Sequence, residues 1–128
     1  MVQKRYILKN LTVEDCDIRN VSHTGIKFTG QKENIQNVTV SGNKIMETGG
    51  PGLQFSNVLG GKVSHNWVSH SGNTSDSRKW GRGSGLWTWG CTDFVIEHNQ
   101  FLHANGPGDS AGCNIISAQT MQVDSLRF

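Results

Sequence analysis

Two stretches of sequence decide the fold: Val63-Ser64-His65-Asn66-Trp67-Val68 and Ile96-Glu97-His98-Asn99-Gln100-Phe101. They share one frame, in which an aliphatic residue is followed three positions later by asparagine and five positions later by another apolar residue. The frame also occurs earlier, as Val40-Ser41-Gly42-Asn43-Lys44-Ile45 and as Val13-Glu14-Asp15-Cys16-Asp17-Ile18. Repetition of this kind indicates an array of similar structural units.

A glycine-led segment follows each copy of the frame. These segments are Gly25-Ile26-Lys27-Phe28, Gly52-Leu53-Gln54-Phe55, Gly85-Leu86-Trp87-Thr88 and, more loosely, Gly112-Cys113-Asn114-Ile115. The fourth position of the frame recurs at 16, 43, 66 and 99, with periods of 27, 23 and 33 residues. Short alternating segments separated by glycine are typical of β-strands. Such units bury their apolar side only when they stack, each about 4.8 Å above the last.

Alternation along the strands assigns the inward face of each coil. The predicted inward columns are Val13, Val40, Val63 and Ile96; Ile18, Ile45, Val68 and Phe101; and Ile26, Leu53, Leu86 and Cys113. We expect Asn43, Asn66 and Asn99 to stack at a corner, where their amides can hydrogen-bond to one another and to turn backbone. Cys16 fills that corner in the first coil, so the ladder ends there.

At these residues the chain resembles the pectate-lyase-like superfamily of right-handed parallel β-helices, of the bacterial polysaccharide-degradation type. The resemblance covers roughly residues 10–116. It implies an all-β solenoid of right hand and a secreted or periplasmic location. Because the superfamily contains lyases, hydrolases, esterases, epimerases and phage tailspikes, the resemblance leaves the reaction open. Calcium is the one cofactor that it implies, and the residues themselves indicate none, since they contain no dense aspartate cluster.

The chain is expected to form a single β-helix segment. The predicted coils are approximately 6–30, 35–57, 58–90 and 92–116, and residues 117–128 are a divergent tail or a partial fifth coil. Four coils are few, and no amphipathic capping helix is apparent, so we interpret the chain as part of a longer solenoid. Strand edges exposed at both ends would favour self-association.

Composition excludes several classes of partner. Twelve basic and ten acidic residues among 128 give a formal charge of +2, and without a concentrated basic face nucleic acid is not expected. No stretch is apolar for long enough to span a membrane, and this chain shows no signal peptide. Three widely spaced cysteines indicate neither a disulfide framework nor a zinc site.

The coils differ at one corner, where binding residues are expected. The spacing from the fourth frame position to the glycine is 9 residues in the first two coils, 19 in the third and 13 in the fourth. Long loops on a rigid scaffold often carry function, although a merely solvated loop remains an alternative. Tryptophan faces can stack on sugar rings, and basic groups suit uronate carboxylates. The predicted substrate-binding residues are Trp80, Trp87, Arg78, Lys79, Arg82, Asn105 and Asn114.

The candidate catalytic residues are carboxylates and histidines near that corner. They are Asp109, Asp76, His103, His70 and Glu47. A glycosidase needs a proton donor together with a base or nucleophile, usually two carboxylates, and histidine is an alternative acid or base. A lyase would instead use Arg78, Lys79 or Arg82 as its base. His65 and His98 form a second stacked pair, but it should face another side, so no metal site is predicted.

Three functions remain open at this level. A polysaccharide-active enzyme, hydrolase ahead of lyase, is the first prediction, with a polysaccharide or oligosaccharide as the partner. A non-catalytic β-helix that binds glycan, as in an adhesin or tailspike, is the alternative. A structural spacer is the third, and the unequal loops argue against it.

Overall fold

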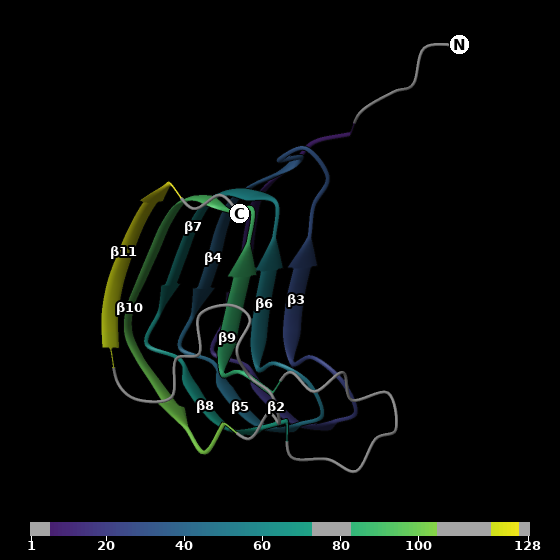
Figure 1. The fold of residues 1–128 in the computed structure, drawn as a ribbon, viewed down its shortest axis with the longest axis vertical. Coiled ribbons are helices and arrows are strands. Elements are labelled where there is room, and N and C mark those ends of the chain that lie inside the picture. Colours follow the sequence, from purple (N-terminus) through teal and green to yellow (C-terminus); the bar gives the residue numbers. More distant parts are fainter. Residues whose placement is uncertain (1–5, 73–82, 105–118, 126–128) are drawn as a thin grey trace.

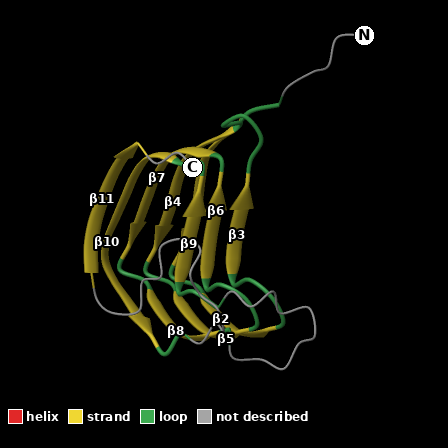
Figure 2. Ribbon diagram, in the orientation of Figure 1, coloured by secondary structure: helices red, strands yellow, loops and turns green. Residues whose placement is uncertain are grey.

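The computed structural model describes residues 6–72, 83–104 and 119–125, and within these it contains β-strands and no helix (Figure 2). The strands are β1 (Leu8–Glu14), β2 (Asp17–Val21), β3 (Ile26–Thr29), β4 (Ile35–Ser41), β5 (Lys44–Thr48), β6 (Leu53–Ser56), β7 (Val58–Ser64), β8 (Trp67–Ser71), β9 (Leu86–Trp89), β10 (Thr92–Leu102) and β11 (Gln119–Ser125). In the part of the chain covered here, no helical segment could cross a membrane.

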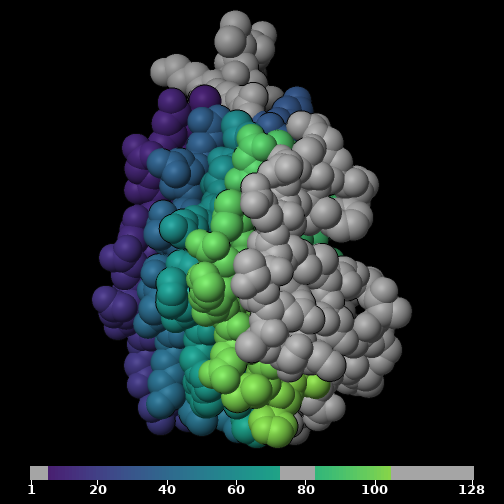
Figure 3. Space-filling model, turned by 90° about the vertical axis from the view of Figure 1, so that its left-hand side faces the viewer, coloured from purple at the N-terminus to yellow at the C-terminus, as the bar shows by residue number. Residues whose placement is uncertain are grey.

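The strands wind into a spiral of parallel sheets (Figure 1). Sheet A contains β1, β4, β7 and the first part of β10; sheet B contains β2, β5, β8 and the last part of β10; sheet C contains β3, β6 and β9. Coil 1 is therefore β1–β3, coil 2 is β4–β6 and coil 3 is β7–β9, and β10 starts the next coil. Figure 3 shows the coils side by side as purple, blue, teal and green bands. The expected all-β parallel solenoid is confirmed.

The register confirms that equivalent residues of the repeat stack. Val13 pairs with Val40, Val40 with Val63, and Val63 with Ile96 along sheet A. The columns that begin at Ile18 in sheet B and at Ile26 in sheet C are likewise in register, as far as Phe101 and Leu86 respectively. In coils 2 and 3 these side chains are completely buried, so the repeat itself builds the core.

The predicted asparagine ladder is present at the corner between sheets A and B. The Oδ1 atom of Asn66 accepts hydrogen bonds from the backbone N and the Nδ2 of Asn43, each at 3.0 Å. The Oδ1 atom of Asn99 does the same for Asn66, each at 2.9 Å. Cys16 ends the ladder through its backbone N, which donates to Oδ1 of Asn43 at 3.0 Å.

Residues in the left-handed conformation recur at equivalent positions of successive coils, within sheet A, at the corner between sheets A and B and near the end of sheet B, which the sequence analysis did not anticipate. Three columns have positive φ through successive coils: Asn10, Asn37, Gly60 and Asp93; Asp15, Gly42, His65 and His98; and Asn20, Glu47, His70 and His103. Residues other than glycine rarely adopt this conformation, and asparagine, aspartate and histidine do so most readily. The requirement explains why these residue types recur at these positions.

A small residue and a large one, Gly61 and Phe94, together fill the core between coil 3 and β10. Gly61 lies next to Phe94 in sheet A, and a Cβ on Gly61 would come within 2.5 Å of the Phe94 ring. The ring therefore occupies space that a side chain at position 61 would need, and it meets Phe55 edge to face at 5.3 Å between centroids. Glycine is required here by close approach of the ring.

The C-terminal strand does not continue the parallel spiral. β11 pairs with β10 in antiparallel register, with Phe94 opposite Val123 and Ile96 opposite Met121. In Figure 1 it lies along the outer edge of β10 in sheet A. A fifth coil would run parallel, so β11 instead forms an antiparallel border on this sheet.

Candidate functional site

The structure describes only some of the predicted site residues. Glu47, His70, His103 and Trp87 lie within the described ranges. The other predicted residues lie outside them, so their roles stay predictions: Asp76, Asp109, Arg78, Lys79, Trp80, Arg82, Asn105 and Asn114.

The outward face of sheet C carries the candidate binding surface. Register places Lys27, Gln54 and Trp87 in one column across β3, β6 and β9. Thr29, Ser56 and Trp89 form the second outward column of the same sheet. We call these six residues the sheet C face. The inward positions between them belong to the core, so the sheet holds this face rigidly.

Two tryptophans of β9 form the aromatic part of the sheet C face. The rings of Trp87 and Trp89 are close to parallel, at 19°, with centroids 6.5 Å apart. Trp89 is 53% exposed although it is a large apolar side chain, whereas Trp87 is half-buried. Trp89 was not among the binding residues predicted from the sequence, and its exposure makes it a candidate for contact with a ligand.

A short polar chain fixes the amide beside Trp87. Thr24 donates from its hydroxyl to Oε1 of Gln54 at 3.4 Å. Since a hydroxyl has a single proton, His23 must donate from Nδ1 to Thr24 Oγ1, at 2.8 Å. Gln54 is buried, so its NH₂ group is held as a donor next to the Trp87 ring. His23 and Thr24 were missed by sequence reasoning; their position just before Gly25 at the start of sheet C was the available signal.

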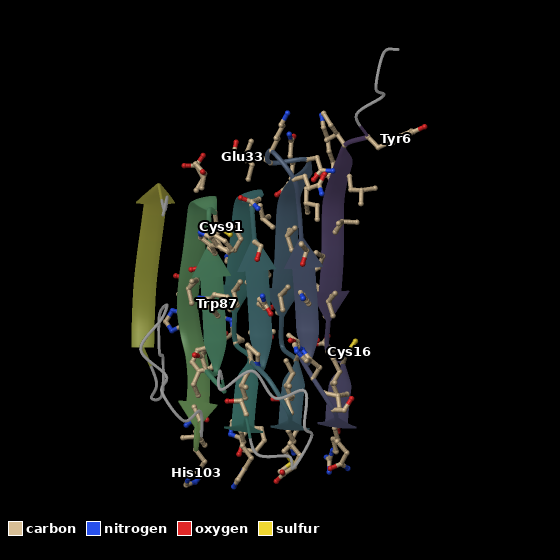
Figure 4. All side chains as sticks on the ribbon, turned by 45° about the vertical axis from the view of Figure 1, so that its right-hand side comes forward. Tyr6, Cys16, Glu33, Trp87, Cys91 and His103 are labelled. Atoms are coloured by element: carbon tan, nitrogen blue, oxygen red, sulfur yellow. The ribbon has the colours of Figure 1, made fainter. Side chains whose placement is uncertain are left out.

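The predicted catalytic histidines do lie together. The register of β2, β5, β8 and β10 continues into a column of Asn20, Glu47, His70 and His103 at the end of sheet B. The rings of His70 and His103 have centroids 4.8 Å apart. Figure 4 places His103 below the lower ends of the strands, away from Trp87 at mid-height on β9. The histidine column and the sheet C face are therefore separate features.

The second histidine pair, His65 and His98, lies at the corner between sheets A and B. Its rings are stacked with centroids 5.3 Å apart and an interplanar angle of 21°. Four residues, 66–69, separate His65 from His70 along the chain, and the two pairs lie at opposite ends of sheet B, as the sequence analysis expected. Within residues 6–72, 83–104 and 119–125, no three histidine, cysteine, aspartate or glutamate side chains gather as a metal-binding group.

The pKa shifts with clear physical causes belong to the Asp17–Arg19 pair and to Cys91. The Arg19 guanidinium donates to both carboxylate oxygens of Asp17, at 2.7 and 2.9 Å, and this hydrogen bonding lowers the pKa of Asp17. Burial raises the pKa of the Cys91 thiol. Neither group lies on the sheet C face. The electrostatics of this face therefore come from Lys27 and from neutral hydrogen-bonding groups.

The stacked parallel sheets and the asparagine ladder at their corner define a β-solenoid as the class of this protein. A family model described as "Right handed beta helix region" matches residues 6–125. The chain belongs to this right-handed β-helix family. Searches of curated proteins and of solved structures gave no match.

Proposed function

We propose that the sheet C face binds a polysaccharide, and that the chain belongs to a secreted or periplasmic carbohydrate-active protein. The supporting observation is the tryptophan pair on β9, in which Trp89 is exposed and Trp87 is half-buried, on the same outward face as Lys27 and Thr29. Apolar C–H faces of sugar rings pack on aromatic rings, and sugar hydroxyls need nearby donors and acceptors. Trp89 supplies the first, and the exposed Lys27 and Thr29 supply the second. The buried Gln54 and Ser56 lie between these residues and the tryptophans in the same two columns.

The shape of the solenoid supports an extended ligand over a small one. Outward residues of successive coils repeat at the spacing of neighbouring parallel strands, about 4.8 Å. Two columns of side chains therefore run across three strands of sheet C. A chain of sugar units can contact several positions of such a face at once, whereas a single sugar reaches only one or two.

Cleavage of the bound polysaccharide is the second part of the proposal, with hydrolysis ahead of elimination. Its candidate groups are those predicted from the sequence, Asp109 and Asp76 together with His103, His70 and Glu47. No carboxylate is among the six residues of the sheet C face, so binding is the function that this face supports by itself. A non-catalytic glycan-binding β-helix remains the alternative.

Binding is tested with tryptophan variants and a panel of plant and algal polysaccharides. Affinity electrophoresis of the full chain should identify at least one retained polysaccharide. Trp89→Ala should weaken that retention about tenfold, because a tryptophan anchor commonly contributes about 1.4 kcal/mol or more. The matched control is Trp67→Ala, since Trp67 lies on sheet B, over Lys44. Equal weakening by both variants, or no retention on any polysaccharide, would overturn the assignment of this face.

The same panel separates cleavage from binding. New reducing ends without ultraviolet absorbance indicate hydrolysis, and an unsaturated uronate product indicates elimination. Asp109→Asn should abolish either activity and leave retention intact. Retention without any product would favour the non-catalytic alternative, and activity that survives in Asp109→Asn would remove Asp109 from the catalytic set.

A further inference from the structure

The His70–His103 pair, which the cleavage proposal treats only as a candidate acid or base, has a geometry that polysaccharide binding by the sheet C face does not use. Both residues adopt the left-handed conformation, with φ of 57° and 54°, and they occupy equivalent positions at the end of sheet B, His70 near the end of β8 and His103 directly after β10. Their centroids are 4.8 Å apart and their planes are inclined by 30°. Stacked imidazoles one coil apart therefore form a two-nitrogen site at a fixed backbone spacing.

One nitrogen of the pair is already oriented. Ser69 Oγ lies within hydrogen-bond reach of Nδ1 of His70. Ser69 is 2% exposed, so its hydroxyl cannot swing into solvent and the imidazole is held against it. When Nδ1 donates its proton to this hydroxyl, the lone pair is on Nε2. Metal-binding histidines commonly show this arrangement, in which the second ring nitrogen donates to an oxygen of the protein.

The neighbouring residue in the column adds a carboxylate. Register places Glu47 beside His70 on the side opposite His103, because Thr48 pairs with Ser71. Imidazole is a preferred ligand for Zn²⁺, Cu²⁺ and Ni²⁺, and a nearby carboxylate adds favourable charge for a dication. The other histidine pair differs here, because Gly42 occupies the corresponding position beside His65.

The distances allow one ion to be shared. Each imidazole nitrogen lies about 2.0–2.1 Å from a bound Zn²⁺, so two such nitrogens can be no more than about 4.2 Å apart. The centroid distance of 4.8 Å is close to this limit, and rotation of the exposed His103 side chain is the movement that the shared ion requires. The more parallel rings of His65 and His98, at 5.3 Å and 21°, keep their in-plane lone pairs side by side and further apart.

We propose that His70 and His103 together bind one divalent transition-metal ion, Cu²⁺ or Zn²⁺, through one nitrogen of each ring. The site uses two protein ligands, which agrees with the absence of a three-residue group in the described part of the chain. Water or an added ligand completes the coordination. The proposal stands independently of polysaccharide binding.

The test uses the full chain, freed of metal with a chelator and titrated with Cu²⁺ or Zn²⁺ in a non-coordinating buffer. Calorimetry should give one tight ion per chain, and electron paramagnetic resonance of the Cu²⁺ form should show two equivalent imidazole nitrogens. His70→Asn and His103→Asn should each remove this site. Asparagine is chosen because Asn20 holds the same left-handed position in coil 1, so the corner is preserved. Ser69→Ala should weaken binding about 10- to 100-fold.

The matched controls are His65→Asn and His98→Asn, which alter the other pair in the same way. They should leave the stoichiometry and the two-nitrogen signal unchanged. Circular dichroism of each variant reports whether the solenoid is intact, and His103→Asn, at an exposed position, provides the answer if His70→Asn does not fold. A two-nitrogen signal that survives in His103→Asn, equal loss in the His65→Asn control, or no tight ion in the unaltered chain would each overturn the proposal.

Discussion

Truncation of Asn66 to alanine should strongly destabilise the solenoid, because this side chain joins three coils. Its Oδ1 accepts from the backbone N and Nδ2 of Asn43. Its Nδ2 donates to the carbonyl of Val40 and to Oδ1 of Asn99, each at 2.9 Å. The variant loses all four hydrogen bonds in a corner where Asn66 is 2% exposed.

The magnitude follows from the groups that are left without partners. The Nδ2 of Asn43 keeps the carbonyl of Val13, and Oδ1 of Asn99 keeps the backbone N of Asn66. The backbone N of Asn43 and the carbonyl of Val40 each lose a buried partner. Each buried group that loses its hydrogen-bond partner costs about 1–3 kcal/mol, so the free energy of unfolding should fall by about 2–6 kcal/mol. This is a large fraction of a typical stability of about 5–15 kcal/mol.

Urea unfolding followed by circular dichroism measures this loss, with Cys16→Ala as the matched control at the end of the same ladder. Cys16 is exposed and contributes to the ladder only through its backbone N, so its truncation should change the free energy of unfolding by less than about 0.5 kcal/mol. If Asn66→Ala were no more destabilising than Cys16→Ala, the ladder would not be a source of stability.

Four further outcomes are expected. Gly61→Ala should cost about 1–3 kcal/mol by overpacking the Phe94 ring, and the double variant with Phe94→Leu should recover most of it in the same urea assay. Thr88→Val should raise stability by about 1–3 kcal/mol, because the buried Thr88 hydroxyl has no hydrogen-bond partner among the residues that the structure describes; an unchanged or lowered midpoint would contradict this. Cys91, buried and with a raised pKa, should resist alkylation at pH 8 until the chain is unfolded, and stability should decline as pH rises through the unfolded thiol pKa; peptide mapping by mass spectrometry locates the label. Tyr6 and Leu8 are 72% and 54% exposed at the border of β1, so Leu8→Lys should reduce any self-association seen by sedimentation velocity.

Much of the fold could be predicted from the sequence because a parallel spiral repeats its environments. The inward columns and the asparagine ladder follow from spacing alone, since equivalent residues must stack one strand apart. The corner conformations were not predicted, because periodicity says which residues face inward but nothing about the sign of φ. The antiparallel pairing of β11 was not predicted either, since strand direction depends on the intervening chain and Val123 fits the period of a parallel coil.

The candidate site was predictable in part. Trp87, Gln54 and Lys27 share an outward column that alternation identifies, and the histidine pairs follow from the period. The exposure of Trp89 could not be predicted, because an outward tryptophan can equally be covered by a neighbouring loop. The contact of Ser69 with His70 was also invisible, since it depends on the left-handed turn at position 70.

Those left-handed corners explain how one scaffold carries different chemistry in successive coils. A side chain at such a corner lies outside the core, so it can change without a cavity or clash, provided that the residue tolerates positive φ. The column after sheet B changes from Asn20 to Glu47 to His70 and His103 on an unchanged backbone path. Residues with a functional role are therefore expected where equivalent positions differ between coils. Residues with a structural role are expected where these positions agree, as Asn43, Asn66 and Asn99 do in the buried ladder. Because equivalent positions of successive coils have the same backbone geometry, exchanging residues between coils should change the side-chain chemistry without changing the fold.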